Sequence, residues 1–176
     1  KEEGDQARWS PWRTIVVGSP PPLAPTARNI KLSSKPQLQG DAGYVRAEGV
    51  VSGPGLLGTY RALCAIDGAT EQQSTPAAIA EAAADGSDAQ AAEAVAIFCA
   101  QFGSVLADTV MVTGATRVYV AGGIVTKILP MLERSDFVAR FLDKGVMREV
   151  LQRVPVRLID HPHKGVIGVA SWYLQQ

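Results

Sequence analysis

Two adjacent glycines, Gly122 and Gly123, stand where a strand-like run, "VYV", passes into an apolar pattern typical of a helix. Glycine weakens strands and helices, so two glycines at the junction between a strand and a helix need a reason. One reason is a ligand that lies against bare backbone, where free N–H groups at a helix start can bind polar atoms. The other reason is close packing of the strand against the helix. These residues alone leave both explanations open.

A second group of candidate residues lies in "YVRAEGVVSGPGL". The carboxylate of Glu48 could accept hydrogen bonds from two adjacent sugar hydroxyls, although a solvated glutamate in the first turn of a helix is the structural alternative. Ser52 and Gly53 open the sequence "SGPG", whose amides and hydroxyl could bind phosphate. An ordinary break between two helices is the alternative, and Pro54 supplies no N–H group.

Three other features are not predicted to carry chemistry. The segment "DHPH" at 160–163 holds potential metal ligands, but no third ligand follows at a suitable spacing, so we predict a polar loop and no metal site. The segment "DGAT" at 67–70 follows a helical pattern and is predicted to be a loop. Cys64 and Cys99 form no close pair, which indicates core residues of a reduced, cytoplasmic protein.

The elements that must position these residues follow a regular order after residue 40. Strands are predicted at "RVYVA" and "VPVRLID", with helices between and after them, which is typical of an α/β fold with adjacent parallel strands. Thr75, Pro76 and Gly86 carry the cap, first-position and end signals of a short helix. Asp88 is predicted to cap a long helix that runs to about Val112. Its inward face is predicted to contain Ala92, Val95, Phe98, Cys99, Phe102, Leu106 and Val110.

The remaining elements are predicted from shorter patterns. A short helix, a Gly-Pro-Gly break and a second helix are expected in "VRAEGVVSGPGLLGTYRALCAI". Helices are also expected from Val125 and from Ser135. A closing helix, "GVIGVASWYL", contains small residues that would allow close packing beneath a nucleotide.

Residues 1–40 differ in composition from residues 41–176. They contain six of the 11 prolines and a charge excess of three basic groups. We therefore predict an irregular arm, with one possible short strand at "TIVVG". A proline-rich recognition segment around "GSPPPLAP" is the alternative.

Composition restricts the class of protein. The 176 residues contain 17 basic and 17 acidic side chains, and this neutral balance argues against a nucleic-acid partner. No uninterrupted apolar run approaches the roughly 18 residues that a membrane-spanning helix needs, so no membrane association is predicted. The first residues have no signal-peptide pattern, and the missing initiator methionine favours a fragment.

Five segments taken together resemble the C-terminal half of the bacterial glucokinases, which are sugar kinases of the actin-like (ribonuclease H-like) superfamily. The segments are "VRAEGVVSGPGLLGTYRAL", "AVAIFCAQFGSVLAD", "VYVAGGIVTKILPML", "FLDKGVMREVLQRVPVRLI" and "GVIGVASWYL". The resemblance runs from about Gly43 to the end of the chain. It implies the C-terminal α/β domain of such a kinase, with a mixed sheet flanked by helices.

The resemblance also implies roles for the candidate residues. Gly122 and Gly123 would lie against the adenosine of ATP, and Ser52 and Gly53 would belong to the same nucleotide site. Glu48 would bind glucose. Gly49 stands where the family usually has arginine, and we expect it to soften a helix at this point.

The implied reaction is transfer of the γ-phosphoryl group of MgATP to glucose, a step of glycolysis. The family's base is an aspartate in an Asn-Asp pair of the N-terminal half, but the only asparagine here is Asn29. The family's early glycine-rich phosphate turn and its Gly-Glu-Gly-Gly-His segment are also missing from the sequence. We therefore expect a partial glucokinase with no assigned catalytic residue, inactive alone. A complementing N-terminal half or a homo-oligomer is the expected partner.

Two functions from other classes stay open at this point. One is a non-catalytic module that binds nucleotide or sugar, or a subunit that a partner completes. The other is a DNA-binding regulator, which the neutral charge and the lack of a helix-turn-helix before residue 40 disfavour.

Overall fold

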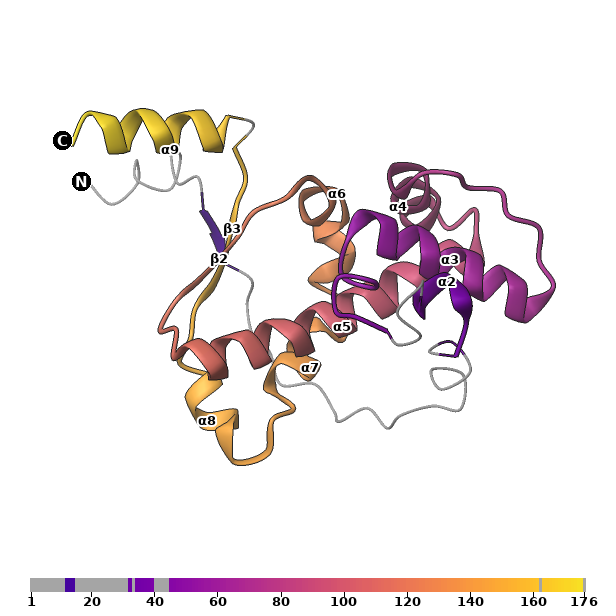
Figure 1. Cartoon of the computed structure of the whole chain (residues 1–176), viewed down its shortest axis with the longest axis horizontal. Coiled ribbons are helices and arrows are strands. Elements are labelled where there is room, and N and C mark those ends of the chain that lie inside the picture. The colour runs from indigo at the N-terminus through magenta and orange to yellow at the C-terminus, as the bar shows by residue number, and fades with distance from the viewer. Residues whose placement is uncertain (1–11, 15–31, 33, 40–44, 162, 176) are drawn as a thin grey trace, which may run out of the picture.

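The computed structural model describes residues 12–14, 32, 34–39, 45–161 and 163–175. Over this part of the chain it is an α/β structure in which a small sheet lies beside a larger helical body (Figure 1). In chain order the elements are β1 (Trp12–Thr14), α2 (Pro36–Gln39), α3 (Gly53–Asp67), α4 (Pro76–Asp85), α5 (Ala89–Thr113), β2 (Val118–Val120), α6 (Gly123–Leu132), α7 (Phe137–Leu142), η3 (Gly145–Met147), α8 (Arg148–Leu151), β3 (Val156–Ile159) and α9 (Lys164–Tyr173).

Helix α5 is the central element of the helical body. It begins where the Asp88 carboxylate accepts the N–H group of Ala91 at 3.0 Å, as predicted, and it ends at Gly114 in the left-handed conformation, close to the predicted end at about Val112. Figure 1 shows α5 running between the group formed by α3, α4 and α6 and the shorter helix α7. Both ends of this helix were therefore set by local sequence.

The buried face of α5 is rotated slightly from the predicted one. Ala92 is exposed, and Phe102 and Leu106 are only half-buried, while smaller residues take their place in the core. The buried residues are Ala91, Ala94, Val95, Phe98, Cys99, Gly103, Ala107 and Val110. Small side chains form much of the face because α7 approaches closely, a contact that the α5 sequence alone does not reveal.

Helix α5 is also long enough and apolar enough to cross a membrane, by length and composition alone. The sequence prediction concerned uninterrupted apolar runs, and polar residues such as Glu93, Gln101 and Asp108 interrupt this helix. Four other helices pack on α5, and its buried residues belong to the main hydrophobic core. We assign it as the core helix of the fold.

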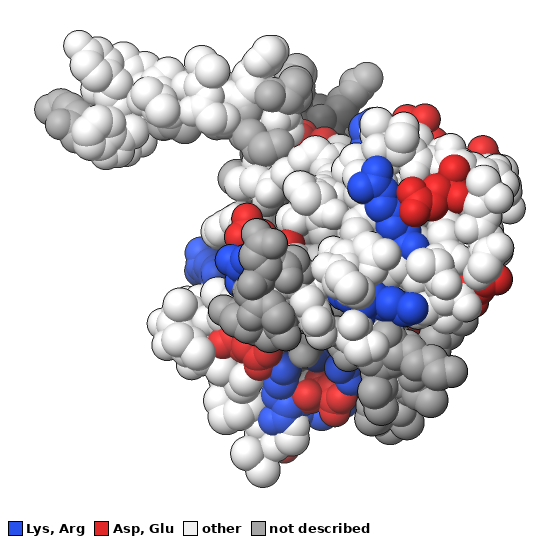
Figure 2. Space-filling model, turned by 45° about the vertical axis from the view of Figure 1, so that its right-hand side comes forward, with Lys and Arg blue, Asp and Glu red and all other residues white. Residues whose placement is uncertain are grey.

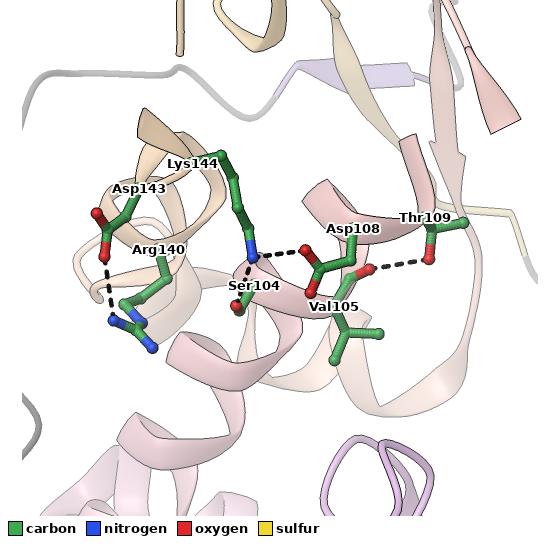
Figure 3. A network of polar contacts seen from close by, with 7 residues as sticks. All are labelled: Ser104, Val105, Asp108, Thr109, Arg140, Asp143 and Lys144. Carbon is green, nitrogen blue, oxygen red and sulfur yellow. Dashed lines mark hydrogen bonds and ion pairs between the residues drawn. The ribbon is translucent and has the colours of Figure 1, made fainter. Parts of the chain in front are cut away.

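The crossing of α5 and α7 is fixed by a close backbone approach and by one lysine. A Cβ atom at Gly103 would lie 2.1 Å from the carbonyl oxygen of Phe137, so only glycine fits there. Beside this contact, Lys144 Nζ lies 2.7 Å from Asp108 Oδ1 and 3.1 Å from Ser104 Oγ (Figure 3). The two helices are therefore held by packing and by a partly buried ion pair.

Helix α3 corrects the prediction of two helices with a Gly-Pro-Gly break. Residues 46–51 form hydrogen-bonded turns, and the Gly53-Pro54-Gly55 sequence is the first turn of α3 itself. Proline is favoured at this position because the first N–H groups of a helix have no intrahelical partner. A Cβ atom at Gly55 would lie 2.8 Å from the backbone of Gly49 and Val50, so this glycine permits the turn to pack on the helix.

The sheet has the strand order β1-β3-β2. Strand β2 pairs parallel to β3, with Val118 opposite Val156, and β1 pairs antiparallel to β3 on the other side. This mixed sheet confirms the predicted α/β class and the predicted adjacent parallel strands. Val120, Val156 and Leu158 are buried and join the hydrophobic core. The sheet therefore attaches to the helical body through one apolar face.

Two short elements lie inside the segment 1–40, which the sequence predicts as an irregular arm. Strand β1 forms because its backbone pairs with β3, and α2 packs on α3. The predicted strand "TIVVG" overlaps β1 only at Thr14, and its other residues lie outside the described part of the chain. The sequence "GSPPPLAP" also lies outside it.

Helix α9 corrects the expectation of close packing beneath a nucleotide. Figure 1 shows it, in yellow, at the end of β3 and away from the helical body. A Cβ atom at Gly165 would meet no described atom within 4 Å, and the described side chains from Gly165 to Gln175 are exposed. Among the described residues, Gly165 therefore has no close packing partner.

Candidate functional site

A groove of about 450 Å³ lies at the start of α6, beside the carboxyl end of β2. Its lining combines the backbone of Gly122 and Gly123 with side chains from α5 and from the turn before α3. A helix start next to the carboxyl end of a parallel strand is where α/β folds commonly bind ligands. The groove is therefore the candidate site, and it contains both glycines predicted to contact a nucleotide.

The two glycines are present for different reasons. Gly122 has a φ of 155° and a ψ of 147°, a backbone conformation that residues with a Cβ atom rarely adopt. Gly123 is the first residue of α6 and has no positive φ, and a Cβ atom there would meet no described atom within 4 Å. Close packing of strand against helix therefore does not require glycine at Gly123, so this alternative is not supported.

The start of α6 offers donors to a ligand. No side chain caps this helix, and its first-turn N–H groups have no intrahelical partner. The carbonyl of Gly122 already accepts from the Thr126 hydroxyl at 3.1 Å and from the Thr126 N–H group at 3.4 Å. The exposed backbone groups of this turn are therefore donors, which suit an oxygen-rich or anionic ligand.

The start of α3 lies beside the start of α6. Ser52 lines the same groove as Gly122 and Gly123, and Gly53 lines an adjoining hollow of about 400 Å³ together with Gly123 and Ile124. A Cβ atom at Gly53 would lie 3.4 Å from the Ile124 side chain. The structure therefore brings together the four residues that the sequence proposed for one nucleotide site.

The hydroxyl of Ser52 already has two partners. It donates to the carbonyl oxygen of Glu48 at 2.6 Å and accepts from the N–H group of Gly55 at 3.0 Å. Both bonds belong to the N-terminal cap of α3, so the hydroxyl shapes the turn before the helix. The proposed phosphate contact from this hydroxyl would have to compete with the cap.

Glu48 lies in the turn before α3, and its side chain is exposed. The expectation that Glu48 and Gly49 belong to a helix is wrong, because residues 46–51 form turns. The Glu48 side chain is not part of the groove lining, although its carbonyl is bonded to Ser52, which is. The structure therefore places Glu48 next to the candidate nucleotide site but outside it.

The apolar wall of the groove was missed by the sequence reasoning. Phe98, Phe102 and Leu106 of α5 line it, together with Tyr119 of β2. Phe102 and Leu106 were predicted to lie in the core, yet they are half-buried because they border the groove. Their spacing of four along one helix was the available signal. This wall gives the groove one apolar side opposite the backbone donors.

Among the described residues, none that lines the groove carries a carboxylate. Within the described part of the chain, no group of three or more His, Cys, Asp or Glu side chains could hold a metal ion. The described residues therefore offer no multi-carboxylate metal site at this groove.

The two cysteines lie in the core, as predicted. Both are buried and unpaired, and burial raises the pKa of the Cys99 thiol to about 11 and also raises the pKa of Cys64. Both thiols are therefore neutral near pH 7 and are poor nucleophiles.

Comparison with known proteins matches the chain to one family. The family model described as Glucokinase matches residues 23–176. A glucokinase-like protein of Xylella fastidiosa (strain Temecula1 / ATCC 700964) is 42% identical over 153 residues, which are 86% of this chain and 46% of that protein. The glucokinase of Hahella chejuensis is 36% identical over 164 residues, 93% of this chain and 50% of that protein. The chain thus spans about half the length of the curated relatives it matches.

Solved structures give the same result. A glucokinase from an Antarctic psychrotroph is 30% identical with a TM-score of 0.74, covering 91% of this chain and 49% of that chain. The glucokinase of Balamuthia mandrillaris, solved in complex with glucose, is 17% identical with a TM-score of 0.69. It covers 82% of this chain and 42% of that chain, and at this identity it supports the fold alone.

Proposed function

The chain belongs to the glucokinase family, and from this premise we propose that it forms the nucleotide-binding half of an ATP-dependent glucose kinase. Its fold would correspond to the C-terminal domain of an actin-like sugar kinase. The reaction would convert glucose to glucose 6-phosphate in cytoplasmic glycolysis. The chain would bind ATP weakly alone and would need the other half of the enzyme for turnover.

The observation that best supports this proposal is the glycine at position 123, whose backbone borders the groove without a side chain. Neither backbone strain nor internal packing requires glycine there, and the position opens onto the groove. A ligand close to the backbone is the remaining physical reason. The adenosine of ATP fits this place, because the apolar wall can contact the base while the uncapped start of α6 donates to polar atoms.

The roles of the other candidate residues follow from their positions. Gly53 and Ser52 would border the nucleotide from the start of α3, and Glu48, one turn earlier, would accept hydrogen bonds from glucose hydroxyls. MgATP would bring its metal ion on the phosphates, where the ion neutralises charge during transfer. This chain's own contribution is to hold and orient the two substrates.

Catalysis needs a group that this sequence does not contain at a matching position. A base must accept the proton of the attacking hydroxyl, and the sequence has no Asn-Asp pair. This observation keeps a second function open, in which the chain is a non-catalytic nucleotide- or sugar-binding module or a subunit completed by a partner. Turnover after addition of the missing half would favour the kinase over the pure module.

The experiment for the nucleotide site compares two glycine substitutions. Gly123→Val fills the groove beside the backbone and should weaken ATP binding at least about tenfold. Gly165→Val is the matched control, because Gly165 is the other described glycine that has neither positive φ nor an atom near an added Cβ. Binding is measured by calorimetry with MgATP, and folding by circular dichroism. Equal ATP affinity in the two folded variants would overturn the proposed site.

A further inference from the structure

We infer that the pocket between α4, α5 and α6 is a second binding site, that it takes a small organic anion, and that its occupancy weakens nucleotide binding. The ligand class is a carboxylate or a phosphate monoester with a compact apolar body. The site itself does not depend on the proposed function. Only its effect on nucleotide binding rests on that function.

The pocket has the size of a small-molecule site. Its volume is about 420 Å³, and it lies where the three helices meet. Alanines of α4 and α5 form much of its apolar lining and leave the space open: Ala83, Ala84, Ala92 and Ala96. Pockets that hold small ligands typically measure about 300–1,000 Å³. This volume therefore suits a compact molecule and is too small for a helix or strand of a partner protein.

The two charged residues in the pocket lining are both basic, Lys127 and Arg134. Nε of Arg134 donates to the carbonyl oxygen of Pro130 at 3.1 Å, which holds the side chain at the edge of the pocket. Arg134 forms no ion pair with any described carboxylate. Its terminal N–H groups have the geometry that binds a carboxylate or a phosphate through two parallel hydrogen bonds. The pocket therefore combines an apolar lining with a donor for an anion.

Lys127 can turn towards such an anion at little cost. Its Nζ atom lies 3.7 Å from Oε1 of Glu81 on α4, and the two side chains are 53% and 75% exposed. Exposed ion pairs contribute little to stability, so exchanging Glu81 for a bound anion is nearly neutral. Lys127 and Arg134 together would then neutralise the charge of the ligand.

The wider surface argues against a large polyanion as the occupant. Figure 2 shows basic and acidic side chains mixed in small groups on the face that it presents, and the chain has 17 of each kind. A nucleic acid or an anionic membrane requires an extended basic surface. The anion is therefore held by two local cations and by apolar contact within the pocket.

Lys127 also connects this pocket with the candidate nucleotide site. It lines the hollow of about 400 Å³ that Gly53 and Gly123 border. An anion bound at Arg134 would attract the Lys127 ammonium group and would add negative charge close to that hollow. Both effects oppose the binding of ATP, which is itself an anion. By linkage, ATP must weaken the binding of the anion by the same factor.

The first experiment measures the binding of four small molecules to the full chain by calorimetry. Phenyl phosphate or benzoate should bind, and the tighter of the two identifies the preferred anionic group. Benzyl alcohol and inorganic phosphate should bind at least about tenfold more weakly, because the first has no charge and the second has no apolar body. Failure of both organic anions to bind would overturn the inference. Equal binding of inorganic phosphate would show an ordinary surface anion site and would overturn it as well.

Substitutions assign the binding to this pocket. Arg134→Gln removes a cation, and Ala96→Leu fills the pocket from an exposed position on α5. Each should weaken binding of the organic anion at least about tenfold. Arg117→Gln is the matched control, because Arg117 is exposed and lines neither this pocket nor the groove. Circular dichroism checks folding. Unchanged affinity in folded Arg134→Gln would overturn the inference, whether or not Ala96→Leu folds.

A last comparison separates this inference from the proposed function. Gly123→Val should leave phenyl phosphate binding unchanged, since Gly123 does not line the pocket. Loss of that binding in folded Gly123→Val would place phenyl phosphate in the nucleotide groove and overturn the inference. Saturating phenyl phosphate should weaken MgATP binding at least about fivefold in the wild type but not in Arg134→Gln. Equal ATP affinity with and without phenyl phosphate would overturn the coupling. A chain that binds phenyl phosphate but no ATP would support the site and count against the proposed function only.

Discussion

The hydroxyl of Tyr60 donates a 2.8 Å hydrogen bond to Oδ2 of Asp88, which joins the middle of α3 to the cap of α5. The same oxygen of Tyr60 accepts the N–H groups of Gln72 at 2.9 Å and Gln73 at 3.3 Å. Both side chains are buried, and the other carboxylate oxygen of Asp88 caps α5. One phenol therefore connects two helices and the loop between α3 and α4.

Replacing this phenol should destabilise the fold without affecting the candidate site. Tyr60→Phe keeps the ring but leaves a buried carboxylate oxygen and two N–H groups without their partner. The expected loss in free energy of unfolding is about 1–3 kcal/mol at pH 7. Urea unfolding measures it, and Tyr173→Phe, on an exposed ring, is the control that should change little.

The same contact predicts a loss of stability in alkali. Burial and the bond to Asp88 raise the pKa of Tyr60 from 10.0 to about 12. Since the unfolded chain loses this proton first, the stabilisation is complete below pH 10 and is lost as the pH rises from 10 towards 12. The difference in unfolding free energy between wild type and Tyr60→Phe should therefore shrink over this range. A constant difference up to pH 12 would contradict the raised pKa.

The third prediction concerns Lys144, whose ammonium group bridges α5 and the segment after α7 (Figure 3). The side chain of Lys144 is only 16% exposed, so its ion pair with Asp108 is screened less than a surface pair. Lys144→Met should cost about 1 kcal/mol of unfolding free energy. Arg140→Met removes the more exposed pair with Asp143 and should cost less. Denaturant unfolding measures both losses of unfolding free energy. A larger loss for Arg140→Met than for Lys144→Met would show that Lys144 contributes only its aliphatic stem.

Local capping signals explain which parts of this fold the sequence revealed. Thr75, Pro76 and Gly86 set the ends of α4, and Asp88 sets the start of α5, through contacts within a few residues. The two parallel strands were also recognisable, because each is a short β-branched run beside helical patterns. Features of this kind depend only on neighbours in sequence.

The features that were missed depend on residues far apart in the chain. Gly103 and Gly55 look like weak points in helices, yet each is required by a backbone that approaches from another element. Likewise, the half-burial of Phe102 follows from the groove that α5 forms with β2 and α6. Of the candidate site, the two glycine-rich turns were predicted, while the apolar wall needed the three-dimensional arrangement.

The fourth prediction concerns the proposed sugar ligand, Glu48. In the complex with the missing half, Glu48→Gln should weaken glucose binding by roughly 1.5–3 kcal/mol, because a neutral amide replaces a charged acceptor. ATP binding should stay unchanged, since the Glu48 side chain lies outside the groove lining. Glu149→Gln, on α8, is the control for loss of one negative charge. Equal glucose affinity in all three proteins would make Glu48 an ordinary surface residue.

The last prediction is that the chain alone does not phosphorylate glucose. No Asn-Asp pair or early phosphate turn is present in the sequence, and the aspartates Asp67 and Asp160 lie outside the groove lining. A missing base typically costs about 10²–10⁴ in rate, and loose positioning of the phosphates costs more. The measurement is a coupled assay for glucose 6-phosphate, with the chain alone and with the missing half of a related glucokinase.

Each outcome of that assay has a distinct physical meaning. Activity that appears only after addition of the half would mean that base and nucleotide site come from different chains. It should then disappear with Gly123→Val, which fills the proposed nucleotide side of the groove. Excess half should not restore activity to Gly123→Val, because its defect is expected in nucleotide binding and not in association. Turnover by the chain alone, near the rate of an intact kinase, would show that residues 1–40 or one of the two aspartates supply the base after all.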